Sequence, residues 1–261
     1  MNQAKAGYVN WAVLVASVMP LIEGYSENIR EAQKYKDELM SKGQKIFEEK
    51  VSMTFRSKLG FHPRDVSADE LWESLEPLLL VTRVDWTLFW RRLMLVARNF
   101  PLHIEAKDYE EMFQLLNGDE NQNQGSSPFY SPLEENDKIK YIQWIQSWRE
   151  ALEIAYASDG TSIRLSQSDE KPLSAAERMR ISNPKYILRE HLLVEAYSKA
   201  YAIKSSFFAS LKNEPNDESK LFELYDLIQN PYDEGDDNQD RRFFRRTPDS
   251  ALSAGGTAFM S

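Results

Sequence analysis

Apolar residues recur every three or four positions along nearly the whole chain, which is the spacing of amphipathic helices. A first helix is predicted near the N-terminus, where Val9, Val13 and Ala16 share one face. Pro20 shares that face and is expected near the end of the helix, because proline disrupts a helix interior. The pattern therefore begins with a helix and not with a strand.

A long second helix is predicted from Glu27 to about Lys58, with many charges among its apolar positions. Ser26 is the expected N-cap, since a serine side chain can accept a hydrogen bond from the first turn. Gly43 is expected to weaken or kink the helix, because glycine has a low helix propensity. Gly60 is a candidate for the left-handed residue that ends it.

The serine and acidic residue at Ser67 and Glu70 have the spacing of a capping box. They predict a helix that starts there and carries apolar residues as far as Leu78. Pro77 predicts a break or kink near its end. Asp85 is the expected cap of the following helix.

The middle of the chain alternates between polar and periodic segments. Residues 117–133 have almost no apolar content and predict a loop. A helix from Ile139 to Ala155 follows, and its aromatic residues recur at three and four positions, as in a core-facing stripe. Residues 158–172 predict a second polar linker.

Three features describe the C-terminal part. Asn183 is the expected cap of a helix that reaches Tyr201, and Pro184 suits its first turn. A short helix over Leu221 to Ile228 follows and ends at Asn230 and Pro231. The chain then turns from acidic to basic and ends rich in small residues.

No internal repeat and no convincing strand appears, so the predicted fold class is all-α. We divide the chain into a helical region at 1–116, a polar loop at 117–133, a second helical region at 134–230 and a charged, glycine-rich tail at 231–261. With 42% hydrophobic and 12% aromatic residues, the chain can bury a sizeable core.

Charge and composition exclude several classes of function. The net charge of −9 argues against broad binding to nucleic acid or to an anionic membrane. The chain has no cysteine, which excludes disulfides, thiolate metal sites and cysteine nucleophiles. Its apolar runs are too short for a membrane-spanning helix.

Few residues suggest chemistry. His62, His103 and His191 stand too far apart for a recognisable zinc motif, and a structural role is favoured for His191. Asp85 is interpreted as a helix cap with a nearby salt bridge, the alternative being a catalytic carboxylate. No phosphate-binding glycine loop is present; Gly255 and Gly256 are a weak signal. We therefore assign no catalytic, cofactor-binding or metal-binding residue.

The segment from Arg241 to Arg246 alternates arginine pairs with two phenylalanines. This pattern can bind RNA or phosphate. The favoured interpretation is that the arginines pair with the adjacent acidic run or dock on the body of the protein. The five tryptophans at helical spacing are explained by core packing: Trp72, Trp86, Trp90, Trp144 and Trp148.

Seven short blocks resemble the selenoprotein O family, called YdiU in bacteria, and follow the order of that family. Two departures occur in the first block, where Ala4 replaces a proline and Asn10 and Trp11 are transposed. The tail after Tyr232 fits least well. The blocks are Asn2–Ile22, Phe55–Phe61, Asp85–Leu93, Trp144–Arg149, Asn183–Leu192, Asn230–Tyr232 and Pro248–Asp249.

The resemblance implies the helical C-terminal region of a protein-kinase-like (pseudokinase) fold. Members of the family transfer AMP from ATP, with Mg²⁺, to Ser, Thr or Tyr hydroxyls of proteins. The residues that bind ATP and metal in the family precede the first block, so none is carried over to this chain. We therefore expect this chain alone to bind neither ATP nor Mg²⁺ and to be inactive.

The expected partners are the upstream kinase-like core and, in the full-length family, protein substrates, with no nucleic acid and no membrane. The family implies a mitochondrial location in eukaryotes and a cytoplasmic one in bacteria. We further expect Met1 to mark an incomplete gene model or a separated fragment. Ser261 is expected to precede a selenocysteine and two serines, the alternative being simple truncation. The alternative is a stand-alone helical interaction protein with a basic–aromatic tail.

Overall fold

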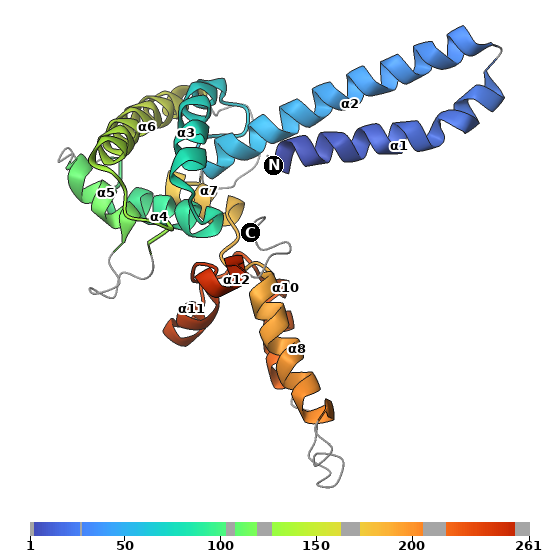
Figure 1. Cartoon of the computed structure of the whole chain (residues 1–261). Coiled ribbons are helices and arrows are strands. Elements are labelled where there is room, and N and C mark those ends of the chain that lie inside the picture. Colours follow the sequence, from blue (N-terminus) through green and yellow to red (C-terminus); the bar gives the residue numbers. More distant parts are fainter. Residues whose placement is uncertain are drawn as a thin grey trace.

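The computed structural model describes residues 3–26, 28–102, 108–118, 127–162, 173–205 and 218–253. The all-α prediction is confirmed for these residues, whose nearest approach to a sheet is an isolated antiparallel bridge between Val84 and Phe129. Figure 1 shows a globular helical body, a two-helix arm that projects from it, and a second, smaller group of helices. In the described part of the chain, no helix has the length and apolarity needed to cross a bilayer.

Helices α1 (Gln3–Tyr25) and α2 (Ile29–Lys58) form the arm. They run antiparallel, and their connection lies at the end far from the body (Figure 1). The predicted cap of α2 was wrong: Asn28 has the extended backbone of an N-cap, and its side chain accepts from the amide of Glu31 at 3.0 Å. Ser26 instead donates to the carbonyl of Ile22 at 2.6 Å, at the end of α1.

Helix α2 continues through Gly43 without a break, contrary to the expected weak point. The glycine lies against α1, because a Cβ atom added there would clash with the Trp11 indole. Val15 and Ala32 are the buried apolar residues between the two helices. Pro20 lies inside α1, in its last two turns.

The end of α2 was predicted correctly. Gly60 has a φ of +91°, which is the left-handed conformation that glycine adopts at low cost. Its amide donates to the Ser57 carbonyl at 3.0 Å, and the next amide, of Phe61, donates to Arg56 at 2.9 Å. These two bonds are the Schellman pattern that ends a helix and turns the chain sharply.

The capping box predicted at Ser67 does not form. A short 3₁₀ turn, η1 (Val66–Ala68), intervenes, and the Asp65 side chain accepts from the Ser67 amide at 3.1 Å. Helix α3 (Asp69–Thr82) then starts without a side-chain cap and continues past Pro77. Buried Leu75 and Leu79 hold both sides of the proline against the body, which offsets the lost backbone hydrogen bond.

Four more helices complete the body: α4 (Trp86–Asn99), α5 (Tyr109–Asn117), α6 (Glu135–Ser162) and α7 (Ala175–Ser182). Helix α4 packs against α5 and α7, while α6 packs against α3 and α5. Helix α5 ends at Asn117 and α6 starts at Glu135, and of the loop predicted at 117–133 the structure describes residues 117–118 and 127–133. The linker predicted at 158–172 starts too early, because α6 continues to Ser162.

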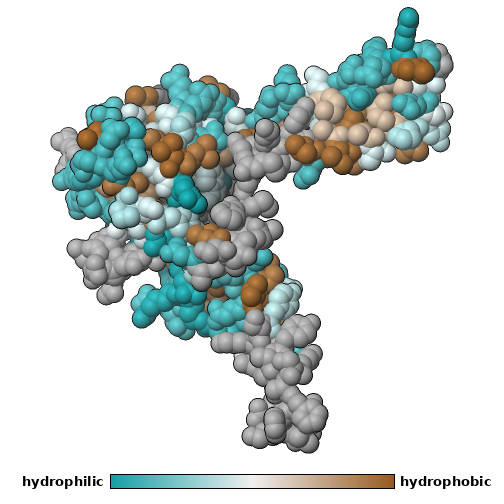
Figure 2. All heavy atoms as spheres, viewed as in Figure 1, coloured by the Kyte–Doolittle hydropathy of each residue, from teal (hydrophilic) through white to brown (hydrophobic). Residues whose placement is uncertain are grey.

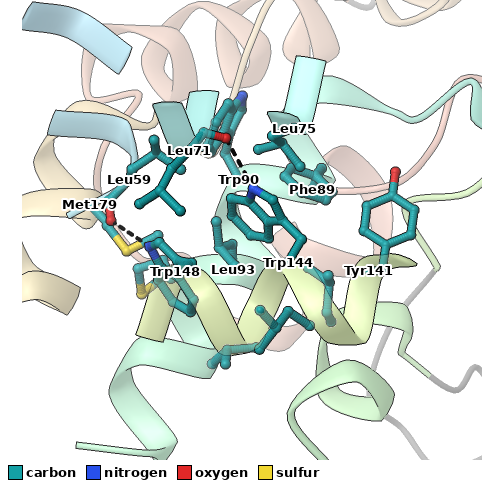
Figure 3. Packing of buried hydrophobic residues seen from close by; sticks show 14 of the residues in the cluster. Leu59, Leu71, Leu75, Phe89, Trp90, Leu93, Tyr141, Trp144, Trp148 and Met179 are labelled. Atoms are coloured by element: carbon teal, nitrogen blue, oxygen red, sulfur yellow. Dashed lines mark hydrogen bonds between the residues drawn. The ribbon is translucent and has the colours of Figure 1, made fainter. Parts of the chain in front are cut away.

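The main core lies between α2, α3, α4, α5, α6 and α7, and its tryptophans are packed as predicted. Trp144 and Trp148 from α6 stack with ring centroids 5.9 Å apart. Their indole nitrogens donate to the carbonyls of Leu71 and Leu59 at 3.0 and 2.9 Å (Figure 3). The indoles thus tie α6 to α3 and to the end of α2 while burying large apolar surfaces.

The second group contains α8 (Glu190–Ser205), α10 (Ser219–Gln229), α11 (Asp237–Phe243) and α12 (Asp249–Ser253). It has a small core of its own, built from Tyr186, Leu192, Leu224 and Phe243. The last two helices fall in the predicted 231–261 tail, so that part of the tail is folded. A capping box in which Asp236 and Gln239 exchange hydrogen bonds starts α11.

Candidate functional site

The segment from Asn183 to Arg189 joins the body to the second group of helices. A helix was predicted to begin at Pro184, but α8 begins only at Glu190. Asn183 ends α7, where its side-chain amide donates to the Met179 carbonyl at 2.8 Å. Pro184 disfavours a helical conformation in the residue before it, so α7 stops there. The amides of Lys185 and Tyr186 then donate to the Pro231 carbonyl at 2.6 and 3.2 Å.

Asp85 and Arg189 form a fully buried ion pair at the end of this segment. The guanidinium donates from both terminal nitrogens, at 2.6 Å to Oδ2 and 2.8 Å to Oδ1. Their side chains are 0% and 2% exposed. Asp85 also caps α4 as predicted, since its Oδ1 accepts from the Leu88 amide at 3.1 Å. The salt bridge was expected with neighbouring arginines, but Arg189 lies 104 residues further along the chain.

Two hydroxyl groups complete the surroundings of the pair. The Tyr130 hydroxyl donates to Asp85 Oδ2 at 3.3 Å, and Arg189 donates to Thr247 Oγ1 at 3.2 Å. Burial and the nearby Asp85 carboxylate raise the pKa of Tyr130. Four separate stretches of chain thus meet at this ion pair, which makes it a structural junction.

A second cluster of charges lies on the same segment. Lys185 donates to Glu234 at 2.9 Å and to Asp240 at 2.8 Å. The Tyr186 hydroxyl donates to the other Asp240 oxygen at 2.5 Å. Burial, followed by the hydrogen bond and charge of Asp240, raises the pKa of Tyr186 well above its usual range. The phenol is therefore a hydrogen-bond donor at neutral pH and not a base.

Glu234 links this cluster to α4. It accepts from Arg91 at 2.9 Å, and Arg98 lies 3.6 Å away. Burial acts to raise the pKa of Glu234, but Lys185 and the two arginines outweigh it and hold the pKa below its ordinary value. The carboxylate therefore stays charged and joins the second group of helices to the body.

Lys58, at the end of α2, contacts the start of the same segment. Its ammonium donates to Asn183 Oδ1 at 3.0 Å and to the Ser182 carbonyl at 3.2 Å. Burial and the positive charge of Arg91 lower the pKa of Lys58 to about 8. The neighbouring oxygens accept from the ammonium but carry no full charge that would offset the burial.

The two histidines that the structure describes do not converge on a site. His62 is exposed in the turn after α2, where its Nδ1 accepts from the Arg64 amide at 3.2 Å. His191 lies in the first turn of α8, with both ring nitrogens buried and without hydrogen-bond partners. Burial, then Arg189 and Arg245, lower its pKa. His103 lies outside the described residues, as do Gly255 and Gly256.

The basic–aromatic segment is largely docked, as the favoured interpretation expected. Arg242 makes a bidentate ion pair with Glu223, at 2.5 and 2.7 Å. Arg246 donates to the Phe129 carbonyl and lies over the Tyr130 ring. Phe243 is buried in the second core, and Phe244 packs against it. Arg241 and Arg245 are not accounted for by these contacts.

These arrangements suit cohesion between segments better than catalysis. Within the described ranges, no group of three or more His, Asp or Glu side chains could hold a metal ion. Among the hollows found there, one of about 740 Å³ lies open along α2 alone and another of about 110 Å³ lies between α8, α10 and α11. Sequence analysis singled out Asp85 as a cap and Lys185, Tyr186 and Arg189 within a family block. It missed Tyr130, Glu234 and Thr247, and sequence spacing gave no signal that these residues meet.

Comparison with known proteins supplies the family. The chain is 24% identical over 262 residues to a protein nucleotidyltransferase YdiU of Flavobacterium johnsoniae, which covers all of this chain and 40% of that protein. The YdiU protein of Cytophaga hutchinsonii is 24% identical over 260 residues, with the same coverage of both chains. The YdiU protein of Xanthomonas euvesicatoria is 25% identical over 194 residues, which cover 74% of this chain and 28% of the relative.

No family model and no solved structure matches the chain. The chain spans about two fifths of the length of the first two relatives. The blocks that suggested the family supply both residues of the buried Asp85–Arg189 pair. The predicted resemblance is thus confirmed: the chain is a homologue of the YdiU nucleotidyltransferases, consistent with a C-terminal portion of that family.

Proposed function

We propose that this chain is the helical C-terminal part of a selenoprotein O-type protein nucleotidyltransferase, which transfers AMP from ATP to Ser, Thr or Tyr hydroxyls of proteins. The observation that carries the proposal is the match to YdiU nucleotidyltransferases along the entire chain, together with its short share of their length. Under the same proposal, the kinase-like core of the family lies in a part of the protein outside this chain.

The described residues do not fit Mg²⁺, since no suitable group of acidic or histidine side chains occurs among them. The carboxylates Asp85, Glu234 and Asp240, of which only Asp85 is buried, are each bound to a cation of this chain. A carboxylate held in this way supports structure and is not free to orient a nucleophile. We therefore assign ATP and Mg²⁺ to the remainder of the protein and give this chain a supporting role.

The alternative, a stand-alone interaction protein with a free basic–aromatic tail, has less support. Phe243 is buried and Arg242 is ion-paired to Glu223. A tail that binds partners by aromatic stacking needs its rings exposed. Those two residues instead stabilise the second core.

The test compares this chain alone with a chimera. The chimera joins the chain to the remainder of the Flavobacterium johnsoniae relative, replacing the segment that matches it. We expect α-labelled ATP to label protein in the presence of the chimera and not of the chain alone. The relative's remainder without any such segment is the control, and we expect it to label less.

Two results would contradict the proposal. Label transfer by the purified chain alone would show that its own residues hold the active site. Full activity of the remainder alone would show that the helical part does not support the core.

A further inference from the structure

A small cleft between α8, α10 and α11 collects positive charge on a protein whose net charge is −9. Four of its lining residues are cations, contributed by α10, by α11 and by the turn after α11. Glu195 is the one acidic residue among those that line it. The cations are Lys220, Arg241, Arg242 and Arg245. Such convergence of like charges in a folded structure costs free energy unless an anion is bound.

Internal pairing accounts for only part of this charge. Lys220 donates to Glu195 at 2.6 Å, and Arg242 is held by Glu223. Arg241 donates its Nε to the Asp237 carbonyl at 3.1 Å, which neutralises no charge. The Nε of Arg245 is buried and has no hydrogen-bond partner. A buried guanidinium donor without a partner is costly, which indicates that an acceptor is missing.

Helix geometry explains the arginines on α11 but not the whole cleft. Arg241 and Arg242 lie in the last turn of α11, where cations interact favourably with the helix dipole. Arg245 lies beyond that helix, and Lys220 comes from α10. Their convergence on one hollow is a product of tertiary packing and is independent of the dipole.

The size of the cleft restricts the ligand. Its volume is about 110 Å³, well below the roughly 300–1,000 Å³ of sites for drug-sized ligands and cofactors. A whole nucleotide does not fit, whereas a single tetrahedral oxyanion does. Guanidinium groups bind phosphate oxygens in paired hydrogen bonds, which makes arginine the usual residue for this anion. Phe243 supplies an apolar wall and is too buried to stack on a base.

We propose that this cleft binds one phosphate group, either free phosphate or the phosphate of a phosphoserine side chain, through Arg245 and Arg241. Both sources present the same dianion with three or more acceptor oxygens. The proposal concerns a site separate from nucleotide transfer and does not depend on the function proposed above.

The test titrates the 261-residue chain with sodium phosphate at constant ionic strength, with sodium chloride as the compensating salt, and follows binding by calorimetry. We expect saturable binding that weakens at least about tenfold in Arg245→Gln, the loss of one charged hydrogen-bonding group. Arg64→Gln removes an exposed arginine outside the cleft and is the matched control, expected to bind within about twofold of the parent.

A phosphoserine peptide and its unphosphorylated form distinguish the two sources. Tighter binding of the phosphopeptide than of inorganic phosphate assigns the site to protein-borne phosphate, and equal binding assigns it to the free anion. Arg241→Gln is the second variant if Arg245→Gln does not fold by circular dichroism. Absence of saturable phosphate binding overturns the proposal, as do unchanged affinity in both cleft variants and binding of single-stranded RNA without binding of phosphate.

Discussion

The Asp85 carboxylate uses its two oxygens for four different hydrogen bonds. Oδ1 accepts from the Leu88 amide and from Arg189, while Oδ2 accepts from Arg189 and from the Tyr130 hydroxyl. Burying a charge is costly, and a buried ion pair offsets that cost only when its remaining hydrogen-bonding positions are filled. This carboxylate meets that condition, so removal of one partner leaves an uncompensated buried charge.

We expect Arg189→Met to lower the free energy of unfolding by about 3–5 kcal/mol, the usual effect of breaking a buried pair from one side. Lys140→Met removes an exposed ion pair with Asp137 and is expected to change it by less than about 1 kcal/mol. Urea denaturation measures both. The double variant Asp85→Asn with Arg189→Met should regain part of the loss, and a loss below about 1 kcal/mol in the single variant would contradict the junction role.

Lys58 makes stability rise with pH, as a carboxylate with a lowered pKa does, but in an alkaline window. Its pKa falls to about 8 in the folded chain from an ordinary 10.5. Between these values the unfolded chain binds more protons, so stability rises with pH across that window. At about 1.4 kcal/mol per pKa unit, the rise attributable to Lys58 is up to about 3 kcal/mol.

The difference in stability between the parent chain and Lys58→Met isolates this group from the tyrosines that titrate nearby. We expect the free energy of unfolding of the parent to rise relative to that of Lys58→Met between pH 8 and 10.5. Between pH 6 and 7 the difference should stay constant. Denaturation at each pH measures it. A constant difference over the whole range would show that the Lys58 pKa is not lowered.

At the scale of elements, three helices pass through residues that usually interrupt them. Helix α1 contains Pro20, α3 contains Pro77, and α2 contains Gly43. Propensity is a weak preference, and packing of an apolar face outweighs it. In α2 the glycine also has a positive role, since it makes room for Trp11.

Two glycine-to-alanine substitutions test whether Gly43 is needed to make room for Trp11. Gly24→Ala in α1 meets nothing within 4 Å, so we expect it to stabilise by about 0.5–1 kcal/mol through helix propensity. Gly43→Ala would make Cβ clash with the Trp11 indole, so we expect it to destabilise the protein and to alter tryptophan fluorescence. Equal stabilisation by both would show that α1 and α2 do not pack closely in solution.

At the scale of the whole molecule, the described residues form two apolar cores that are joined mainly by polar contacts. The larger core lies in the body, and the smaller one lies among α8, α10 and α11. The segment from Asn183 to Arg189 connects them, and Glu234 accepts from Arg91 on α4 and from Lys185 on that segment. Figure 2 shows apolar side chains gathered along the arm as well, away from both cores.

Because polar contacts join the two groups, Glu234→Gln should loosen the smaller group while leaving the body intact. We expect hydrogen exchange to accelerate about tenfold or more in α10 and α11, and to stay unchanged in α6. Glu150→Gln changes an exposed glutamate on α6 and serves as the control. Equal acceleration in α6 would show that the two cores unfold as one unit.

The helical period, the cap at Asp85, the left-handed end at Gly60 and the tryptophan core were all predictable from sequence. Each depends on residues within a few positions of one another, where spacing and local chemistry determine conformation. The family also followed from sequence, because the order of short blocks survives at about 24% identity. The caps at Asn28 and Asp65 were missed, since several neighbouring polar residues compete for each position.

Tertiary structure alone decided which distant residues meet. Nothing in the spacing of Asp85 and Arg189 predicts a contact over 104 residues, and nothing near Gly43 reveals that Trp11 crosses there. The segment after Asn183 is not helical, because the Pro231 carbonyl and the Asp85 carboxylate bind it, although its sequence suits a helix. Sequence therefore determined the helices and the family, whereas long-range hydrogen bonds and buried charges determined the junction between the two cores.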